Sequence, residues 1–442
     1  MTVTRQDVSE VNDRYRRSRE LYERALRTIP LGSQTFSKSA MQWVGGVSPL
    51  FLERGEGCRV WDVDGNEYVD YVLGLMPVVL GYCDPDVNEA IRHQLEQGIT
   101  FSLATELEAE LAERLVRIIP CAERVRFGKN GSDATLAATR LARAHTGRDV
   151  IAMCGYHGWH DWSIGTTSRN LGIPKAVREL TVTFPFNDAA ALERIFKESP
   201  ADIAAVILEP AAATDPEPEF LEQVKRLAHE HGALLIFDEI VAGFRAHLGG
   251  AQARYGVTPD LATFGKAMAN GMPISAVVGR ADIMSLMEEI FFSATFGGET
   301  LSLAAAIATL DKLEAHDGPA RMEGAAAELR EGVSMILSER GIGDVYAVTG
   351  PSWWPRIAVG GNDRMPPVLA TSLLRQEFVA NGLLMMSTFN LCLAHVHEAV
   401  VIDTLNRWSR VADVLAVAVN SDDPEKFLRG KPVRPVFQVR SS

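Results

Sequence analysis

The chain has 442 residues, too many for one ordinary hydrophobic core, so two or three structural units are expected. Hydrophobic residues make up 47% and charged residues 23%, as in an ordinary globular protein. The formal net charge of -13 argues against a nucleic-acid partner, because phosphate backbones bind basic surfaces.

The five cysteines are odd in number, irregularly spaced and without a C-x-x-C pair. This pattern argues against a disulfide framework or a zinc site and fits a reducing compartment, so a cytoplasmic location is expected. The polar N-terminus lacks the apolar core of a secretory signal. No run of about 18 apolar residues occurs, so no membrane span is predicted.

The first predicted elements are a helix and a hairpin. The helix is expected over roughly residues 8–29, ended by Pro30 and Gly32. Apolar runs then flank Asp64-Gly65-Asn66, a turn sequence that is typical of a β-hairpin.

From about residue 104 the pattern alternates between helices and short apolar runs. Leu107, Leu111 and Leu115 recur at helical spacing, and a later helix is expected to end on Gly232. Strands are predicted near residues 125, 150, 180, 203, 233 and 274. This alternation predicts a mostly parallel α/β sheet, and the helix-rich segment after about residue 311 predicts a separate lobe.

Polar residues follow four of the apolar runs. Tyr156 and His157 follow IAMCG, and Glu209, Asp238 and Lys266 each follow a different run. Ligands of parallel sheets bind at the carboxyl ends of the strands. We therefore expect these side chains to converge on one crevice.

Lys266 and Asp238 carry the most specific chemistry. Lys266 has small and apolar neighbours, and burial would lower its pKa and free its amine to attack a carbonyl cofactor; an exposed loop lysine is the alternative. Asp238 follows ALLIF and could hold a protonated ring nitrogen. The alternatives are an N-cap or, with Glu239, a magnesium site, but no G-x-x-x-x-G-K-[ST] phosphate loop accompanies it.

Two further motifs are weaker by themselves. Ser132 precedes a clear helical pattern and is expected to be its N-cap, at a helix start that could bind phosphate. Tyr156 could stack on a planar ring. Metal binding by His157 and His160 is a competing interpretation, although their spacing is loose and no third ligand is evident.

Taken in chain order, these motifs resemble one known family. They are WDVDGNEYVDY, GSDA, YHG, a strand ending in EP, a strand ending in DEI, FGKAMANGMPISA and TFGGETL. This ordered set, over about residues 20–415, resembles the class III aminotransferases, which are fold-type I enzymes that use pyridoxal 5'-phosphate (PLP). Within that family the chain is similar to the glutamate-1-semialdehyde aminomutases and, more closely, to aminotransferases of bacterial polysaccharide and amino-sugar genes.

The resemblance implies a fold-type I α/β architecture. Residues 76–310 would form a large PLP-binding domain with a mostly parallel sheet flanked by helices. The N-terminal segment 1–75 and the C-terminal segment 311–442 would form a smaller α+β domain. The family shares its active sites across a homodimer, and no metal is implied.

The resemblance also implies roles for single residues. Lys266 matches the Schiff-base lysine, which shuttles a proton between substrate carbon and cofactor, and Asp238 matches the partner of the pyridine nitrogen. Ile240 and Tyr156 match the residues against the two ring faces, with His157 beside Tyr156.

The phosphate side matches with changes. Gly131 and Ser132 match the phosphate turn, Thr295 matches a threonine from the neighbouring subunit, and Glu209 matches a glutamate near the ring hydroxyl and substrate. The turn reads K-N-G-S-D-A from residue 129 where the family has N-S-G-T-E-A, which keeps a small residue and a hydroxyl. Near residue 299 the usual G-N-P is G-E-T.

Two departures concern the substrate. Lys38 occupies the position of an arginine that holds a substrate carboxylate, and lysine lacks the bidentate fork of arginine. Asn390 stands where the mutase has a glutamate. Both changes favour a less acidic or more hydroxylated substrate, such as a keto-sugar. Ser33 and Gln34 would suit hydroxyl recognition, or they only pack the N-terminal segment.

The expected reaction is transfer of an amino group from a glutamate-like donor to a small carbonyl acceptor. An intramolecular aminomutase on the same scaffold is the main alternative. A non-catalytic binding protein is disfavoured because Lys266 and Asp238 are both present.

Overall fold

The computed structural model describes residues 14–198 and 202–434, which fall into two compact units. Unit 1 combines Met1–Leu75 and Gly81–Cys83 with Met322–Val436, and unit 2 is built on Met76–Leu80 and Asp84–Arg321. Both units are therefore discontinuous along the chain, and the chain passes from unit 2 into unit 1 within helix α13 (Gly318–Glu339).

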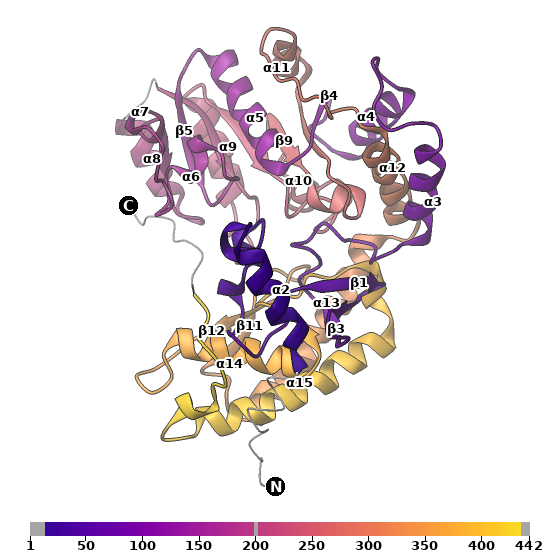
Figure 1. Cartoon of the computed structure of the whole chain (residues 1–442). Helices are drawn as coiled ribbons and strands as arrows, with labels where there is room; N and C mark the ends of the chain where they lie inside the picture. Colours follow the sequence, from indigo (N-terminus) through magenta and orange to yellow (C-terminus); the bar gives the residue numbers. More distant parts are fainter. Residues whose placement is uncertain (1–13, 199–201, 435–442) are drawn as a thin grey trace. The chain divides into compact units, whose positions relative to one another are not determined.

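A seven-stranded sheet forms the centre of unit 2, in the order β4-β10-β9-β8-β7-β5-β6 (Figure 1). The pairs β6–β5, β5–β7, β7–β8 and β8–β9 are parallel, and β10 alone runs antiparallel to its neighbours β9 and β4. The prediction of a mostly parallel sheet is confirmed. The strands are β4 (Arg124–Gly128), β5 (Val150–Cys154), β6 (Thr181–Thr183), β7 (Ile203–Leu208), β8 (Leu234–Asp238), β9 (Leu261–Phe264) and β10 (Ser275–Gly279).

Helices flank this sheet (Figure 1). Helix α5 packs on it through small residues, Ala137, Ala138 and Ala142, which let the helix axis approach the strands closely. The helices of unit 2 are α3 (Pro85–Leu95), α4 (Glu106–Ile118), α5 (Gly131–Thr146), α6 (Asp161–Ile164), α7 (Lys175–Arg178), α8 (Ala189–Glu198), α9 (Phe220–Glu230), α10 (Ala251–Tyr255), η4 (Lys266–Ala269), α11 (Ala281–Met284), η5 (Ser285–Glu288) and α12 (Thr300–Ala315).

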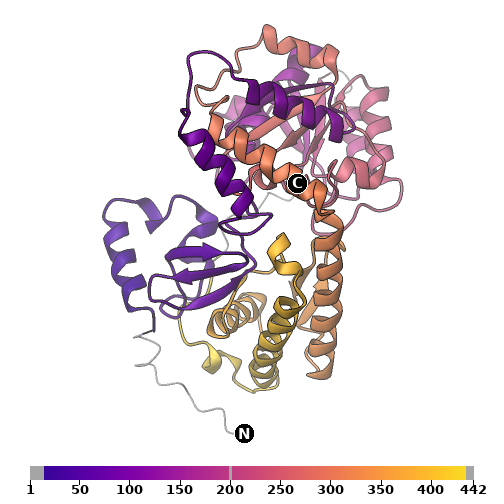
Figure 2. The same cartoon turned by 90° about the vertical axis from the view of Figure 1, so that its right-hand side faces the viewer.

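Unit 1 contains a four-stranded sheet in the order β1-β2-β3-β13. Its N-terminal strands are the purple arrows of Figure 2. Strands β2 and β3 pair antiparallel on either side of Asp64-Gly65-Asn66, which confirms the predicted hairpin. Strand β1 pairs with β2, and β13 adds to β3 in parallel. The strands of unit 1 are β1 (Leu52–Glu56), β2 (Arg59–Asp62), β3 (Glu67–Asp70), β11 (Tyr346–Thr349), β12 (Arg356–Val359) and β13 (Leu383–Leu384).

The helices of unit 1 come from both ends of the chain. From the N-terminal part they are α2 (Arg16–Leu26), η1 (Pro30–Gly32), η2 (Phe36–Lys38) and η3 (Ala40–Gln42); from the C-terminal part they are most of α13, α14 (Pro367–Ala380), η6 (Leu393–Val396), α15 (Glu398–Val419) and η7 (Pro424–Phe427). None of the helices in the described part of the chain is long and apolar enough to cross a membrane.

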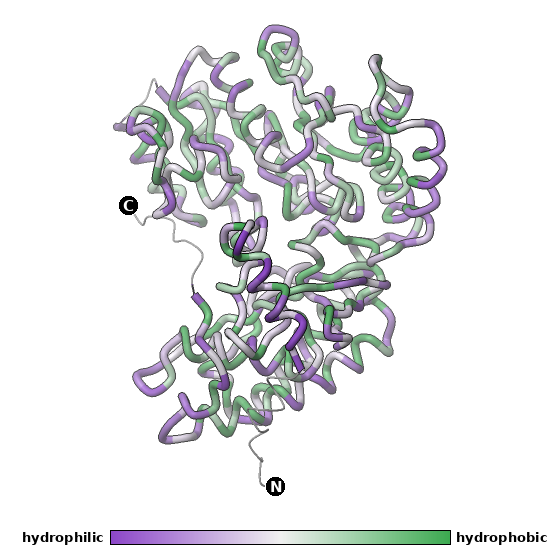
Figure 3. Tube along the Cα trace, viewed as in Figure 1, coloured by the Kyte–Doolittle hydropathy of each residue, from purple (hydrophilic) through white to green (hydrophobic). Residues whose placement is uncertain are grey.

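The first helix is shorter than predicted. Helix α2 ends at Leu26, because the next amides bond back in a tighter turn and Ile29 adopts an extended conformation before Pro30. Figure 3 shows α2 as mainly hydrophilic, and Ser18 is its one buried residue within the described range. Residues 8–13 of the predicted helix lie outside the described residues.

Candidate active site

The carboxyl ends of four adjacent parallel strands gather the predicted polar residues at one edge of the unit 2 sheet. Tyr156 and His157 follow β5, Glu209 follows β7, Asp238 ends β8, and Lys266 lies two residues beyond β9. Parallel strands place their carboxyl ends at the same edge. The expected convergence of these side chains is therefore present in the fold.

Asp238 is held at this edge by a hydrogen-bond network. The residue is 5% exposed, and its Oδ2 lies 2.7 Å from His157 Nδ1. Its Oδ1 accepts hydrogen bonds from the Ile240 amide (3.1 Å) and the Thr263 hydroxyl (3.2 Å). Both carboxylate oxygens are thus fixed, which keeps a buried negative charge in one orientation.

His157 is the counter-ion of that carboxylate. Its ring is buried, and its Nε2 donates to the Cys154 carbonyl at 3.0 Å. Burial is the largest single influence and disfavours the charged ring, but the hydrogen bond and charge of Asp238, together with the charge of Glu209 and the Cys154 carbonyl, outweigh it and raise the pKa of His157. Because both ring nitrogens face acceptors, the geometry favours an imidazolium that donates to Asp238 and to the Cys154 carbonyl.

Lys266 and Glu209 form a second pair of ionisable groups here. Burial lowers the pKa of Lys266 more than the carboxylates of Glu209 and Asp238 raise it. Burial raises the pKa of Glu209 to about 7, and the charge of Asp238 adds to that effect. Lys266 also has a positive φ of 38°, a strained backbone conformation that costs about 1–3 kcal/mol and is common at active sites.

The start of helix α5 lies at the turn that was predicted to bind phosphate, but Ser132 is not its cap. Asn130 is the N-cap, in a capping box with Asp133, whose Oδ2 accepts the Asn130 amide at 2.8 Å. Ser132 is the second residue of the helix, and its Oγ accepts the Trp159 amide at 3.2 Å. The capping box of Asn130 and Asp133 supplies the hydrogen bonds of an N-cap at this helix start. The Ser132 hydroxyl instead accepts the Trp159 amide.

Two glycines at this turn are required by close packing. A Cβ on Gly131 would lie 2.5 Å from Ile240 Cδ1, and a Cβ on Gly158 would lie 2.9 Å from Ser132 Cβ. Ile240 also lies 3.6 Å from the position of a Cβ on Gly265, the residue before Lys266. Ile240 therefore joins the phosphate turn to the lysine segment.

This arrangement fits PLP. It combines a buried amine of lowered pKa, a fixed carboxylate and the N-terminus of a long helix, which favours an anion such as a phosphate. Tyr156, at 43% exposure, follows the same strand as His157. Thr295 lies on an exposed segment between η5 and α12.

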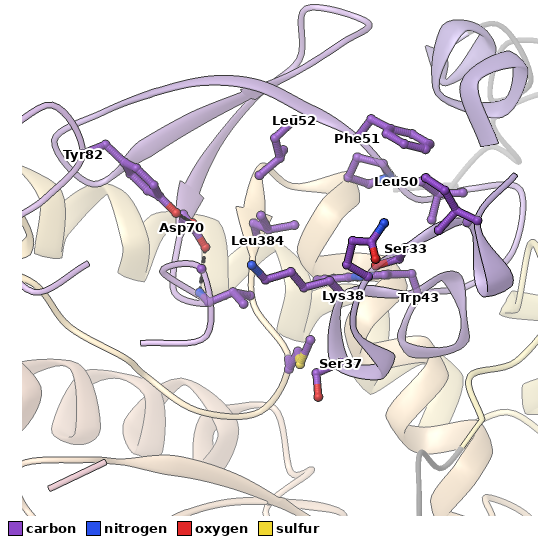
Figure 4. A pocket seen from close by; sticks show the side chains of 17 residues that line it. Ser33, Ser37, Lys38, Trp43, Leu50, Phe51, Leu52, Asp70, Tyr82 and Leu384 are labelled. Carbon is purple, nitrogen blue, oxygen red and sulfur yellow. Dashed lines mark hydrogen bonds between the residues drawn. The ribbon is translucent and has the colours of Figure 1, made fainter. Parts of the chain in front are cut away.

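The predicted substrate residues lie in unit 1. Ser33, Gln34 and Lys38 line a cavity of about 430 Å³ together with apolar side chains such as Trp43 and Leu384 (Figure 4). Asn390 is not among the lining residues. Its side chain is 6% exposed and its Oδ1 accepts the Trp354 indole N–H at 2.7 Å.

Comparisons with known proteins agree with the geometry. The model of the family "Aminotransferase class-III" matches residues 41–350. The 3-aminobutyryl-CoA aminotransferase of Cloacimonas acidaminovorans is 39% identical over 349 residues, covering 77% of this chain and 83% of the relative. A glutamate-1-semialdehyde 2,1-aminomutase of Roseiflexus castenholzii is 41% identical over 355 residues, covering 76% and 81%.

A solved structure extends the similarity to the whole fold. The FumI protein of Sphingopyxis sp. MTA144, in a PLP internal aldimine form, is 31% identical with a TM-score of 0.85, covering 93% of this chain and 100% of that one. The chain belongs to the class-III aminotransferase family. It is a PLP-dependent enzyme of the fold-type I architecture, as the motif order predicted.

Within this class-III aminotransferase, the alternative interpretations of the site lose support. Glu239 turns away from Asp238 and caps helix α10, accepting the amides of Ala251 (2.7 Å) and Gln252 (2.8 Å). Asp238 and Glu239 therefore do not form one ligand pair. Residues 14–198 and 202–434 contain no group of three His, Cys, Asp or Glu side chains that could hold a metal.

The sequence interpretation missed Thr263 and Gly158. Thr263 donates to Asp238 from within β9, and it is the one polar residue in the run LATF, a signal that could have been noticed. Gly158 makes room for Ser132, a requirement that depends on two segments far apart in the sequence and leaves no local pattern.

Proposed function

We propose that this enzyme moves an amino group from a glutamate-like donor to a small carbonyl acceptor. The observation that carries the proposal is the grouping of Lys266, Glu209, Asp238 and His157 at one sheet edge beside the start of α5. PLP, when bound, supplies an electron-withdrawing ring to the carbon that bears the amino group.

The residues at the sheet edge have distinct proposed roles. The Asp238 carboxylate holds a proton on the pyridine nitrogen, with His157 neutralising its charge. The Lys266 amine would bind the cofactor carbonyl in the resting enzyme and would carry a proton to and from the substrate carbon. Ile240 and Tyr156 would hold the cofactor ring, and Glu209 would act near the ring hydroxyl and the substrate.

The phosphate contacts in this proposal come from two copies of the chain. Gly131 and Ser132 at the α5 start hold the phosphate through amides and a hydroxyl. Thr295, exposed in the single chain, would reach the phosphate of the neighbouring site in a homodimer.

The five free thiols in the described chain support a cytoplasmic location.

The acceptor is proposed to be a carbonyl compound with hydroxyl groups, such as a keto-sugar. Lys38 offers one point charge, and Gln34 offers an amide in the same cavity. Ser33 is less available, because its hydroxyl donates to the Thr35 carbonyl at 3.2 Å. A second candidate is an intramolecular aminomutase, which the similarity to the Roseiflexus enzyme supports.

One experiment tests both candidates. The visible spectrum of the PLP-loaded protein is recorded before and after adding glutamate, and the keto acid released is measured. Loss of the cofactor band with keto acid release supports the transaminase. Turnover of glutamate-1-semialdehyde without any external donor, and no response to glutamate alone, supports the mutase. A protein that takes up no PLP contradicts both.

A further inference from the structure

Lys129 and Glu299 form an ion pair directly beside the phosphate turn. The Lys129 Nζ lies 2.9 Å from Glu299 Oε2 and 3.2 Å from Ser302 Oγ. The two charged side chains are only 15% and 11% exposed. They are 170 positions apart in the sequence, and each stands where the chain departs from the usual family motif.

Each partner is anchored at the start of a long helix. Lys129 precedes the Asn130 cap of α5, and its own amide donates to the capping Asp133 at 3.2 Å. Glu299 is the N-cap of α12, with its Oε1 accepting the Leu301 amide at 2.8 Å. The ion pair thus links the N-termini of α5 and α12, which are far apart in the sequence.

The charges are well compensated in this position. Burial alone would raise the pKa of Glu299, but the hydrogen bonds from Ser302 and Lys129 outweigh it and hold the pKa below its ordinary value. Glu299 Oε2 also accepts the Ser302 hydroxyl at 2.6 Å. Removing either charge would leave its partner poorly compensated in a largely buried place.

We infer that Lys129 and Glu299 are positioning residues that fix the phosphate turn, Gly131 and Ser132, against the segment that leads from Thr295 into α12. The inference rests on the proposed function, in which both segments contact cofactor phosphate. Lys129 holds the turn from its N-terminal side and donates to Glu299 and Ser302. Loss of the ion pair should therefore weaken PLP binding by weakening the contacts to the PLP phosphate.

The test compares PLP with pyridoxal, which lacks the phosphate. Dissociation constants of both compounds are measured for the apoenzyme and for the variants Lys129→Met and Glu299→Gln. The ratio of the pyridoxal constant to the PLP constant reports the phosphate contribution alone. We expect this ratio to fall about tenfold in each variant, which corresponds to about 1.4 kcal/mol of lost phosphate binding.

The double variant and a matched lysine complete the design. The combined Lys129→Met, Glu299→Gln variant should lose little more than either single variant, because both disrupt the same contact. Lys312→Met removes another partly buried lysine on α12, whose Nζ pairs with Asp84 (2.8 Å) and Asp86 (2.6 Å), and should leave the ratio unchanged.

The outcomes separate the inference from the function it rests on. An unchanged ratio in both folded single variants overturns the positioning role, while wild-type PLP binding still supports the cofactor site. Wild-type protein that binds PLP no better than pyridoxal contradicts the phosphate turn itself. If Lys129→Met does not fold, Glu299→Gln decides alone, since it keeps the oxygen that caps α12.

Discussion

The Asp238 carboxylate at the sheet edge of unit 2 and the Lys38 ammonium in the cavity of unit 1 are presented in opposite ways. At the edge, Asp238 is 5% exposed and both of its oxygens have fixed partners. In the cavity, Lys38 is exposed and the surrounding walls are largely apolar (Figure 4). Buried, hydrogen-bonded charges keep one geometry for chemistry, whereas an exposed charge adapts to its ligand, which suits substrate selection.

The largest effect should come from the amine at the edge. Lys266→Ala removes the nucleophile and the proton carrier together, so amino transfer should fall by at least ~10³-fold. The rate of the glutamate half-reaction measures this. The thermal unfolding midpoint serves as the control for folding. Retention of the wild-type rate would contradict the assignment of Lys266.

A second test removes one charge from the edge without changing its shape. Asp238→Asn should lower the half-reaction rate by about 10²-fold, because the ring nitrogen loses its counter-charge. It should also lower the pKa of the buried His157, whose raised value depends on the Asp238 carboxylate. NMR titration of the imidazole measures that shift, and an unshifted His157 would argue against the ion pair.

Two buried glutamates should affect the pH dependence of stability alike but differ in their effect on the reaction: Glu209 at the sheet edge and Glu239 at the start of α10. Burial raises the pKa values of both Glu209 and Glu239 to about 7, so the folded chain binds more protons than the unfolded chain above about pH 4.5. Stability should therefore fall as pH rises from about 4.5 to 7.

Glu239→Gln should flatten this slope by up to about 1.4 kcal/mol per pH unit. The half-reaction rate should hardly change, because Glu239 caps α10. Glu209→Gln should flatten the slope and also slow the reaction. Denaturant unfolding of the apoenzyme at several pH values measures how the stability of each variant depends on pH. Equal losses of activity in the two variants would contradict the assignment of a catalytic role to Glu209 and a capping role to Glu239.

The smallest effect is expected at the cavity. Lys38→Met should raise the KM for the acceptor by about fivefold, as for loss of one exposed charge contact, and leave the glutamate half-reaction unchanged. Ser37→Ala, on the same cavity wall but uncharged, is the matched control. A slower glutamate half-reaction in Lys38→Met would show that this cavity is not confined to acceptor selection.

The sequence alone was sufficient for the sheet and for the polar residues at its edge. Short apolar runs and helical spacing are local patterns, and a residue that follows a buried strand must lie at the sheet edge. Lys266, Asp238, Glu209 and His157 were placed correctly on this basis. The length of α2 was overestimated, because a hydrophilic helix end leaves only a weak periodic signal.

Only the tertiary structure decided which side chains form hydrogen bonds or ion pairs with one another. The sequence could not show that Asn130 would cap α5 in place of Ser132, or that Glu239 would turn to α10 while its neighbour Asp238 met His157. Lys129 and Glu299 each stand at a departure from the family motif, but neither motif shows that the two side chains pair. Hydrogen bonds and ion pairs depend on distances that only the folded chain defines, whereas apolar periodicity is a local pattern in the sequence.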